Sequence, residues 1–174
     1  MKIVVISGSP RKNANTQFMM KYVYEYTKSK NEDTKFINLS EGGIDYYSGP
    51  DVEYNEKTKQ AAKDITEADV WLIGTPIYNS FFSSALKNLF EYVNYKKTAG
   101  KTAGIAILAS GSIGFIFVQT LLSQLMTYFG VTTNPKAVFM TTDMMKGEEI
   151  VDESAKDRLK EMVDGTLSIA LKLH

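Results

Sequence analysis

The chain has 174 residues, of which 44% are hydrophobic and 23% are charged, and its 20 Lys and Arg residues balance its 20 Asp and Glu residues. This composition is ordinary for a single soluble globular domain, and it excludes both the basic excess of a nucleic-acid-binding surface and the strong acidity of a carrier that docks on basic partners. There is no cysteine and the one histidine is the last residue, His174, so we exclude thiolate catalysis and cysteine-ligated metals and expect no Ser–His relay.

The chain opens directly on an apolar run, KIVVIS at residues 2–7, with no signal-peptide pattern ahead of it. Runs at residues 35–39, 69–75, 103–109 and 137–141 are also short and apolar, the first of them weakly so, and all of these indicate buried strands. No run approaches the ~18 apolar residues that suggest a membrane span. We therefore expect a cytoplasmic protein.

Amphipathic patterns stand after the strands and predict helices whose apolar stripes pack on the core. The stripes are Met19, Tyr22, Val23 and Tyr26; Thr58, Ala61, Ala62 and Ile65; Leu86, Leu89, Phe90 and Val93; Val118, Leu121, Leu122 and Leu125; and Leu159, Met162, Val163 and Ala170. Strands that alternate with helices indicate a parallel sheet with helices on both faces. We predict the doubly wound, flavodoxin-like α/β fold with five strands in the order 2-1-3-4-5, formed as one domain by residues 1–174.

In such a sheet, ligands bind beyond the carboxyl ends of the strands, near the point where the strand order reverses. The loop after the first strand, SGSPRKNANT, lies at that point. Gly8 permits a tight turn and Pro10 stiffens it. Asn13, Asn15 and Thr16 are candidate caps for the helix that follows.

The same loop has the chemistry of an anion site. A helix N-terminus attracts anions, Ser9, Asn15 and Thr16 offer neutral donors, and Arg11 offers a forked cation. The loop is neither a Walker A motif nor GxGxxG, so we expect a cradle for one terminal phosphate and not a dinucleotide held in the Rossmann manner. The alternative is a well-capped helix with an exposed arginine.

The loop after the third strand reads TPIYNSFFSSALKN. We expect Pro76 to end the strand, Ile77 and Tyr78 to offer an apolar and an aromatic face, and the backbone of Asn79 to offer an N–H group. A flat heteroaromatic ring needs this combination of apolar wall and main-chain donor. The alternative is a hydrophobic loop packed on a neighbouring subunit.

The loop after the fourth strand reads ASGSIG, in which Ser110, Gly111 and Ser112 permit close approach of the backbone to a ligand. By itself this is no more than a turn. Together, however, the three loops place a phosphate site, an aromatic wall and a Gly/Ser turn at one edge of the predicted sheet. A ligand with a phosphate at one end and a flat ring at the other fits, and flavin mononucleotide (FMN) is the candidate.

The two longer motifs resemble those of a known family. SGSPRKNANT resembles the phosphate loop of the NADPH-dependent FMN reductase family, which is flavodoxin-like, and TPIYNSFFSSALKNLFEYV resembles its second signature, Pro-x-Tyr followed by a Leu-Lys pair that opens a helix. The resemblance covers most of the chain. It is especially close to the FMN reductases of sulfonate monooxygenase systems, and it extends to azo- and quinone-reducing flavoproteins.

The resemblance implies roles for individual residues. Those that would hold the FMN phosphate are Ser9, Arg11, Asn15 and Thr16. Those that would line the isoalloxazine ring are Pro76, Ile77, Tyr78 and Asn79. Those that would close over the ring from the third loop are Ser110, Gly111 and Ser112.

The chain departs from the family pattern in two places. Ser84 stands where a glycine usually precedes the apolar–Leu–Lys helix opening. Some relatives carry a cysteine cluster after the second strand, but the matching segment SEGGIDYYSGPDVEY has no cysteine, so no iron–sulfur cluster or other resident metal is expected. The tyrosine-rich loop at 40–55 is expected to be a lid, a subunit contact or a plain surface loop.

We predict an NAD(P)H-dependent FMN reductase that passes hydride from nicotinamide to flavin and on to free flavin, a quinone, an azo compound or a similar acceptor. The protein needs no acid, base or nucleophile for that transfer, because it supplies binding and orientation. The alternative is a flavodoxin-type electron carrier without NAD(P)H oxidation of its own, against which Arg11 and the zero net charge argue. The resemblance further implies a homodimer or homotetramer, and it leaves the choice between NADH and NADPH open.

Overall fold

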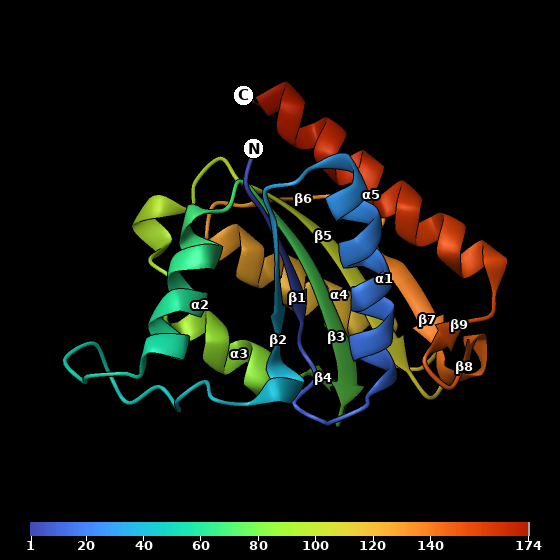
Figure 1. The fold of residues 1–174 in the computed structure, drawn as a ribbon, viewed down its shortest axis with the longest axis horizontal. Helices are drawn as coiled ribbons and strands as arrows, with labels where there is room; N and C mark the ends of the chain where they lie inside the picture. Colours follow the sequence, from blue (N-terminus) through green and yellow to red (C-terminus); the bar gives the residue numbers. More distant parts are fainter. Residues whose placement is uncertain (174) are drawn as a thin grey trace.

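A parallel sheet forms the centre of the computed structural model, which describes residues 1–173 (Figure 1). Its strands are β1 (Ile3–Ser7), β2 (Thr34–Asn38), β3 (Val70–Tyr78), β5 (Thr102–Ala109), β6 (Thr132–Thr133) and β7 (Val138–Thr141). They lie in the order β2-β1-β3-β5, with both β6 and β7 paired to β5. The predicted flavodoxin-like order is therefore confirmed, with a fifth strand that is split into two pieces.

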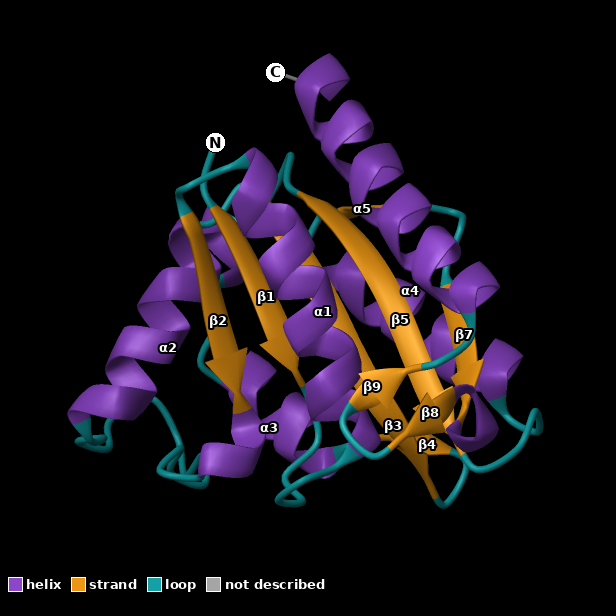
Figure 2. Ribbon diagram, turned by 45° about the vertical axis from the view of Figure 1, so that its right-hand side comes forward, coloured by secondary structure: helices purple, strands orange, loops and turns teal. Residues whose placement is uncertain are grey.

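Within residues 1–173, five α-helices cover the sheet: α1 (Asn15–Lys30), α2 (Glu56–Glu67), α3 (Ser84–Glu91), α4 (Phe115–Tyr128) and α5 (Glu153–Leu173). One apolar cluster joins the sheet to α1 and α5, and a second joins its other face to α2, α3 and α4. Figures 1 and 2 show these two layers, with α1 and α5 together on one side of the strands. The stripes predicted from the sequence supply these contacts, as Met19, Leu86 and Val118 are all fully buried.

The third strand is longer than the sequence predicted. We expected Pro76 to end it, but β3 runs on to Tyr78, and Pro76 pairs with Leu108 of β5. Pairing with β1 has already stopped at Gly74, so the missing N–H group of the proline removes no ladder hydrogen bond on that side. The strand then turns back into the short β4 (Phe81–Phe82), which pairs with it in antiparallel fashion.

The split in the fifth strand has a polar centre at Asn134, which is only 3% exposed. Its backbone N–H donates to the carbonyl of Ala103 at 2.7 Å, and its amide Nδ2 donates to the carbonyl of Met162 at 3.1 Å. The side-chain oxygen accepts from the N–H of Lys136. The backbone N–H and the side chain of Asn134 are thus hydrogen-bonded, as buried polar groups usually are.

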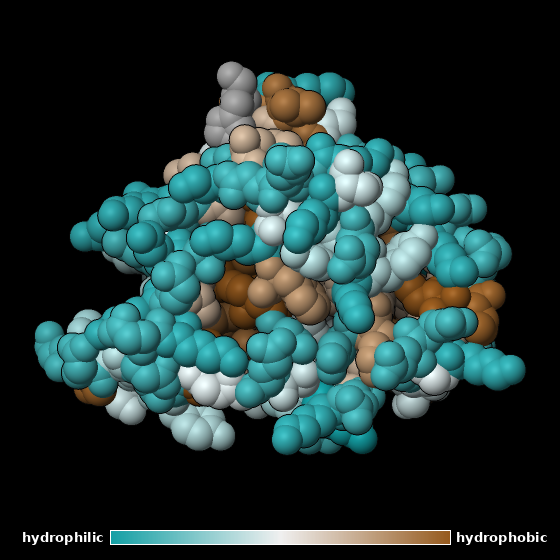
Figure 3. Space-filling model, viewed as in Figure 1, coloured by the Kyte–Doolittle hydropathy of each residue, from teal (hydrophilic) through white to brown (hydrophobic). Residues whose placement is uncertain are grey.

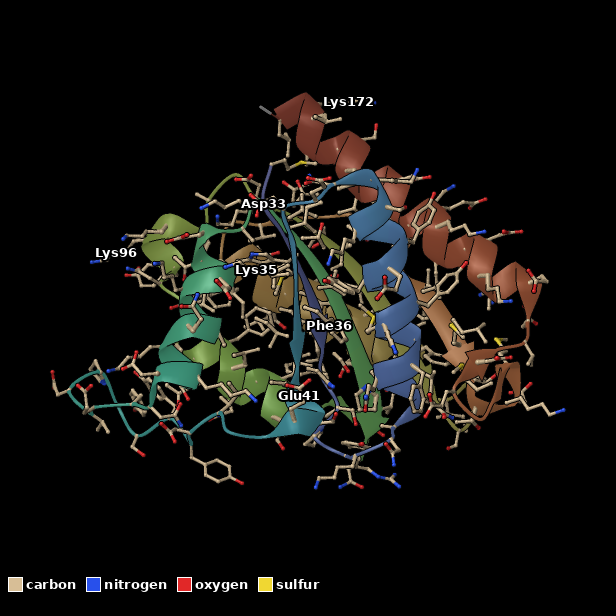
Figure 4. All side chains as sticks on the ribbon, in the orientation of Figure 1. Asp33, Lys35, Phe36, Glu41, Lys96 and Lys172 are labelled. Atoms are coloured by element: carbon tan, nitrogen blue, oxygen red, sulfur yellow. The ribbon has the colours of Figure 1, made fainter. Side chains whose placement is uncertain are left out.

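The opposite edge of the sheet is β2. Figure 4 labels Lys35 and Phe36 on this strand; Lys35 pairs with Asp64 of α2, whereas Phe36 stacks on Tyr24 of α1 at 5.2 Å between ring centroids. The alternation places the two side chains on opposite faces, as expected for a strand. Figure 3 shows a mainly hydrophilic surface on this side, with apolar side chains in the hollow between α2 and β2.

The carboxyl ends of β1, β3, β5 and β7 all point to one end of the molecule, opposite the chain termini (Figure 1). Short 3-10 turns follow strands or helices at η1 (Leu39–Glu41), η2 (Tyr95–Lys97) and η3 (Thr142–Met144). A hairpin of β8 (Met145–Lys146) and β9 (Glu149–Ile150) precedes α5. Among residues 1–173, none of the helices has both the length and the apolar character that a membrane crossing requires.

Candidate functional site

A cavity of about 460 Å³ opens at the carboxyl ends of the strands, where the sequence predicted the site. Loops from four strands contribute to it, and its size is in the usual range for a cofactor pocket. Its lining consists of Arg11, Asn13, Ala14, Asn15, Thr16, Pro76, Ile77, Tyr78, Leu108, Ala109, Ser110 and Thr142. The cavity therefore joins the beginning of α1 to the ends of β3, β5 and β7.

The phosphate-type loop is tightly held against β3. The N–H of Gly8 donates to the carbonyl of Gly74 at 2.8 Å. Ser9 is fully buried, and its hydroxyl lies 3.1 Å from the hydroxyl of Tyr78. The backbone of Arg11 donates to the same Ser9 oxygen at 3.3 Å. One hydrogen bond thus joins the first predicted loop to the second, and another joins it to the preceding part of β3.

The beginning of α1 corrects one expectation. Asn13, Asn15 and Thr16 were expected to cap this helix, but the capping position is Ala14 and no side chain caps it. Asn13 instead has a positive φ of 54°, which asparagine tolerates better than most residues. The first turn contains no acidic residue, and its residues Asn15 and Thr16 line the cavity, so this end of the cavity carries the partial positive charge of a helix N-terminus.

Arg11 adds a full positive charge at this end of the cavity. Its side chain is exposed, and it takes part in none of the salt bridges formed by residues 1–173. The cavity lining includes neither an Asp or Glu nor a Lys. A phosphate is the kind of ligand that such a combination of guanidinium and uncapped helix attracts.

The second predicted loop forms the apolar wall. Pro76, Ile77 and Tyr78 line the cavity from the end of β3. Asn79 and Ser80 form the two-residue turn into β4 and have positive φ values of 49° and 63°, as in a type I′ hairpin turn. Asn79 therefore has a structural role in the turn, and it lies outside the lining.

The third predicted loop contributes less than expected. Ser110 lines the cavity, whereas Gly111 and Ser112 are exposed and lie outside the lining. Ser9 also lies outside the lining, and its hydroxyl contacts that of Tyr78. Seven of the predicted residues are thus brought together in the lining: Arg11, Asn15, Thr16, Pro76, Ile77, Tyr78 and Ser110.

Sequence reasoning missed Thr142, which begins the turn after β7. The predicted topology could have indicated Thr142, because the fifth strand of a parallel sheet ends at the same edge as the other strands. Leu108 was missed because it was assigned only to the fourth predicted strand, and Ala109, which stands where that strand meets the ASGSIG loop, was given no ligand role.

The tyrosine-rich segment after β2 is anchored to α2 and α3. The carbonyl of Asp45 accepts hydrogen bonds from Asn88 and from the Tyr92 hydroxyl, both at 2.7 Å, and the N–H of Asp45 donates to Thr58. Burial raises the pKa of Tyr92 to about 12. The side chain of Tyr46 in the same segment is 88% exposed, so the backbone is fixed while an aromatic ring projects into solvent.

The fold and the cavity together define a class of protein. The cavity offers a cation, an uncapped helix and hydroxyl groups at one end, and an apolar and aromatic wall at the other. That set of donors fits a ligand with a phosphate and a flat ring, such as FMN. The chain is a flavodoxin-like protein with a phosphate-binding turn at the switch point of the sheet.

Comparison of the sequence with the profiles of known protein families gives a match over most of the chain. The profile of the NADPH-dependent FMN reductase family matches residues 1–144. The match covers most of the chain, so the protein belongs to this family. It is an NAD(P)H-dependent oxidoreductase that uses FMN as its cofactor.

Individual relatives agree with the family. The chain is 24% identical over 132 residues to an NAD(P)H-dependent FAD/FMN reductase of Geobacillus thermodenitrificans, covering 75% of this chain and 71% of the relative. It is 25% identical over 155 residues to an FMN-dependent NADPH-azoreductase of Staphylococcus aureus, covering 86% and 82%. The comparisons do not support the alternative of a flavodoxin-type electron carrier.

Solved structures share the fold. The apo form of an NADH:FMN oxidoreductase, EMOB, superposes with a TM-score of 0.78 at 21% identity, covering 99% of this chain and 90% of that one. The NAD(P)H:acceptor oxidoreductase FerB of Paracoccus denitrificans also gives 0.78, at 22% identity, with 98% and 97% covered. At these identities the likeness establishes the flavodoxin-like architecture.

Proposed function

We propose that the cavity at the carboxyl ends of β1, β3 and β5 is the FMN site of a reductase that oxidises NAD(P)H and reduces a small-molecule acceptor. The observation that supports this placement most directly is the uncapped N-terminus of α1, which opens into the same cavity as the apolar wall of β3. One pocket therefore offers complementary chemistry to both ends of the cofactor.

In this proposal the residues divide between the two ends. Arg11, Asn15 and Thr16 bind the phosphate together with the backbone N–H groups of the first turn of α1. Pro76, Ile77 and Tyr78 form the wall for the ring, and Ser110 closes the site from the third loop. Ser9, Asn79, Gly111 and Ser112 act from outside the lining, by fixing the conformation of the loops.

Bound FMN supplies the redox chemistry, which is hydride acceptance from NAD(P)H and electron delivery to an acceptor. The lining contains no carboxylate, imidazole or lysine, which suits a transfer that needs orientation more than proton transfer from the protein. The residues of the site therefore bind, orient and exclude water. The acceptor in this proposal is free flavin, a quinone, an azo compound or a similar small molecule. The names of the Geobacillus and Staphylococcus relatives support flavin and azo compounds within that range.

We further propose a single domain over residues 1–174 and a homodimer or homotetramer. Support for the oligomer comes from the apolar side chains that α4 and the turn before it expose, with Ile113 87%, Ile116 64% and Phe117 69% exposed. This surface adjoins the cavity, because a Cβ on Gly114 would lie 3.5 Å from Ile77. Aromatic and aliphatic groups of this kind are typical of interface cores. We place the enzyme in the cytoplasm, where NAD(P)H is supplied, with no nucleic-acid or membrane partner.

The experiment that tests the function is an absorption titration of the purified apoprotein with FMN, followed by anaerobic addition of NADPH and, separately, NADH. We expect a perturbed flavin spectrum that bleaches rapidly, and the faster nucleotide identifies the donor. A bound flavin that stays oxidised would contradict the reductase and favour the carrier. A protein that leaves the flavin spectrum unchanged would contradict the FMN site itself.

A further inference from the structure

The hydroxyl groups of Ser9 and Tyr78 lie 3.1 Å apart, although the two residues belong to different loops of the site. Ser9 follows β1 and is fully buried, whereas Tyr78 ends β3, is half-buried and lines the cavity. The contact fixes the position of the phenol. The oxygen of Tyr78 lies at the phosphate-type turn and not at the free end of the β3–β4 hairpin.

The donors and acceptors around Ser9 favour one direction for this hydrogen bond. The Ser9 oxygen accepts the N–H of Arg11 at 3.3 Å, so its own proton needs an acceptor. Within residues 1–173, the Tyr78 oxygen is the acceptor in reach, because the other contact of the Ser9 hydroxyl is with a donor. Ser9 is 0% exposed and lies outside the cavity lining, so its hydroxyl has no direct route to a ligand. Either oxygen could donate in this contact, and the arrangement in which Ser9 donates to Tyr78 is the one that leaves the buried Ser9 proton paired.

This direction leaves the phenolic proton of Tyr78 unused by the protein. A hydroxyl that accepts one hydrogen bond becomes a better donor of another, because chains of hydrogen bonds polarise one another. The proton is available on a side chain that lines the cavity, next to the uncapped end of α1. The matching partner is an anionic oxygen, since hydrogen bonds to charged acceptors are the stronger ones.

We infer that the Tyr78 hydroxyl is a ligand of the FMN phosphate, and that Ser9 is a positioning residue that acts through it. The relay runs from the N–H of Arg11 to the Ser9 oxygen, and from the Ser9 hydroxyl to Tyr78 and the phosphate. This inference rests on the proposed FMN site. It changes the assignment of both residues, because Ser9 was expected to bind the phosphate directly and Tyr78 to line the ring.

The test compares FMN with riboflavin, which has the same ring and no phosphate, in binding titrations followed by flavin fluorescence. We expect Tyr78→Phe to raise the dissociation constant of FMN by roughly 10- to 150-fold, the range of a hydrogen bond to a charged group, and to leave that of riboflavin unchanged. Ser9→Ala weakens FMN binding less. The double variant binds FMN no more weakly than Tyr78→Phe alone, because Ser9 acts through Tyr78. Ser9→Thr, which keeps the hydroxyl, restores binding.

Each other outcome contradicts the inference in a distinct way. Unchanged FMN affinity in Tyr78→Phe, with a loss in Ser9→Ala, would make Ser9 the direct ligand. Equal losses of FMN and riboflavin would place the phenol at the ring. Tyr22→Phe, in α1 but outside the cavity lining, is the matched control for removal of a tyrosine hydroxyl, and circular dichroism confirms that each variant is folded. If the wild-type protein binds neither flavin, the proposed function fails and the inference fails with it.

Discussion

Gly8 and Gly74 are in such close contact that the space between them admits no side chain. The N–H of Gly8 donates to the carbonyl of Gly74 at 2.8 Å, and a Cβ on Gly8 would lie 2.7 Å from that oxygen. Because the neighbour is backbone, it has no flexible end that could move aside. This contact joins the phosphate-type turn to the strand that forms the ring wall.

Gly8→Ala should therefore displace the turn. We expect the free energy of unfolding to fall by about 1–3 kcal/mol, the usual cost of overpacking, and FMN affinity to fall as well. Urea unfolding of the apoprotein measures the first effect and flavin titration the second. Gly111→Ala is the matched control, since a Cβ there would meet nothing within 4 Å. Equal stability of the two variants would contradict the tight contact.

Arg11→Ala should weaken FMN binding by about 1.5–3 kcal/mol, the range for a hydrogen bond to a charged group. Riboflavin binding should not change, because the guanidinium is expected to contact only the phosphate. Lys12→Ala is the control: the residue carries the same charge one position later and is not part of the cavity lining. Isothermal titration calorimetry gives both affinities, and equal losses in the two variants would reduce Arg11 to a general electrostatic role.

Tyr92→Phe should loosen the segment after β2, because the hydroxyl donates to the carbonyl of Asp45 at 2.7 Å. Near neutral pH we expect a loss of about 0.5–1.5 kcal/mol of stability. The pKa of Tyr92 is raised from 10.0 to about 12, so its contribution is complete below pH 10 and is lost as the pH rises through 12. The difference from wild type should therefore shrink over that interval.

A spectrophotometric tyrosine titration tests the same residue directly. The wild type should show one phenol that ionises near pH 12 and is missing in Tyr92→Phe. Tyr95→Phe serves as control, since the Tyr95 side chain is 51% exposed. Identical alkaline titration curves for wild type and Tyr92→Phe would contradict the half-buried, hydrogen-bonded phenol.

Phe117→Asp should dissociate the proposed oligomer, because a carboxylate in the centre of an apolar interface costs several kcal/mol of desolvation. Light scattering coupled to size-exclusion chromatography measures the mass. Lys172→Asp, an exposed change near the end of α5 (Figure 4), should leave the mass unchanged. A monomeric wild type, or an oligomer that survives Phe117→Asp, would contradict a subunit contact at this face of α4.

The sequence was sufficient for the architecture because each element has a clear pattern. The buried run IVVI at residues 3–6 contains no polar residue, and stripes such as Leu86, Leu89 and Phe90 repeat at helical spacing. The ends of elements were less predictable. Pro76 is a normal stop signal, but its effect depends on whether a neighbouring strand needs its N–H group, and that is a property of the sheet.

The cavity followed from topology, whereas the role of each side chain did not. Asparagine is a residue type that often caps helices. Asn13, however, adopts a left-handed conformation, and the helix begins at Asn15 with Ala14 in the capping position. Ser9 and Tyr78 are 69 positions apart, and their hydrogen bond depends on the register of β1 and β3. No local pattern contains that information.

The break in the fifth strand has a practical use in protein engineering. Between β6 and β7 the chain leaves the ladder, and Pro135 and Lys136 are exposed, while the buried Asn134 holds the start of the break in place. Flexible inserts at exposed turns cost little loop-closure entropy when their ends are already fixed. An affinity tag or fluorescent label inserted after Lys136 keeps the hydrogen bond from the Lys136 N–H to Asn134. It would sit on the outer edge of the sheet, where it leaves the loops around the cavity undisturbed.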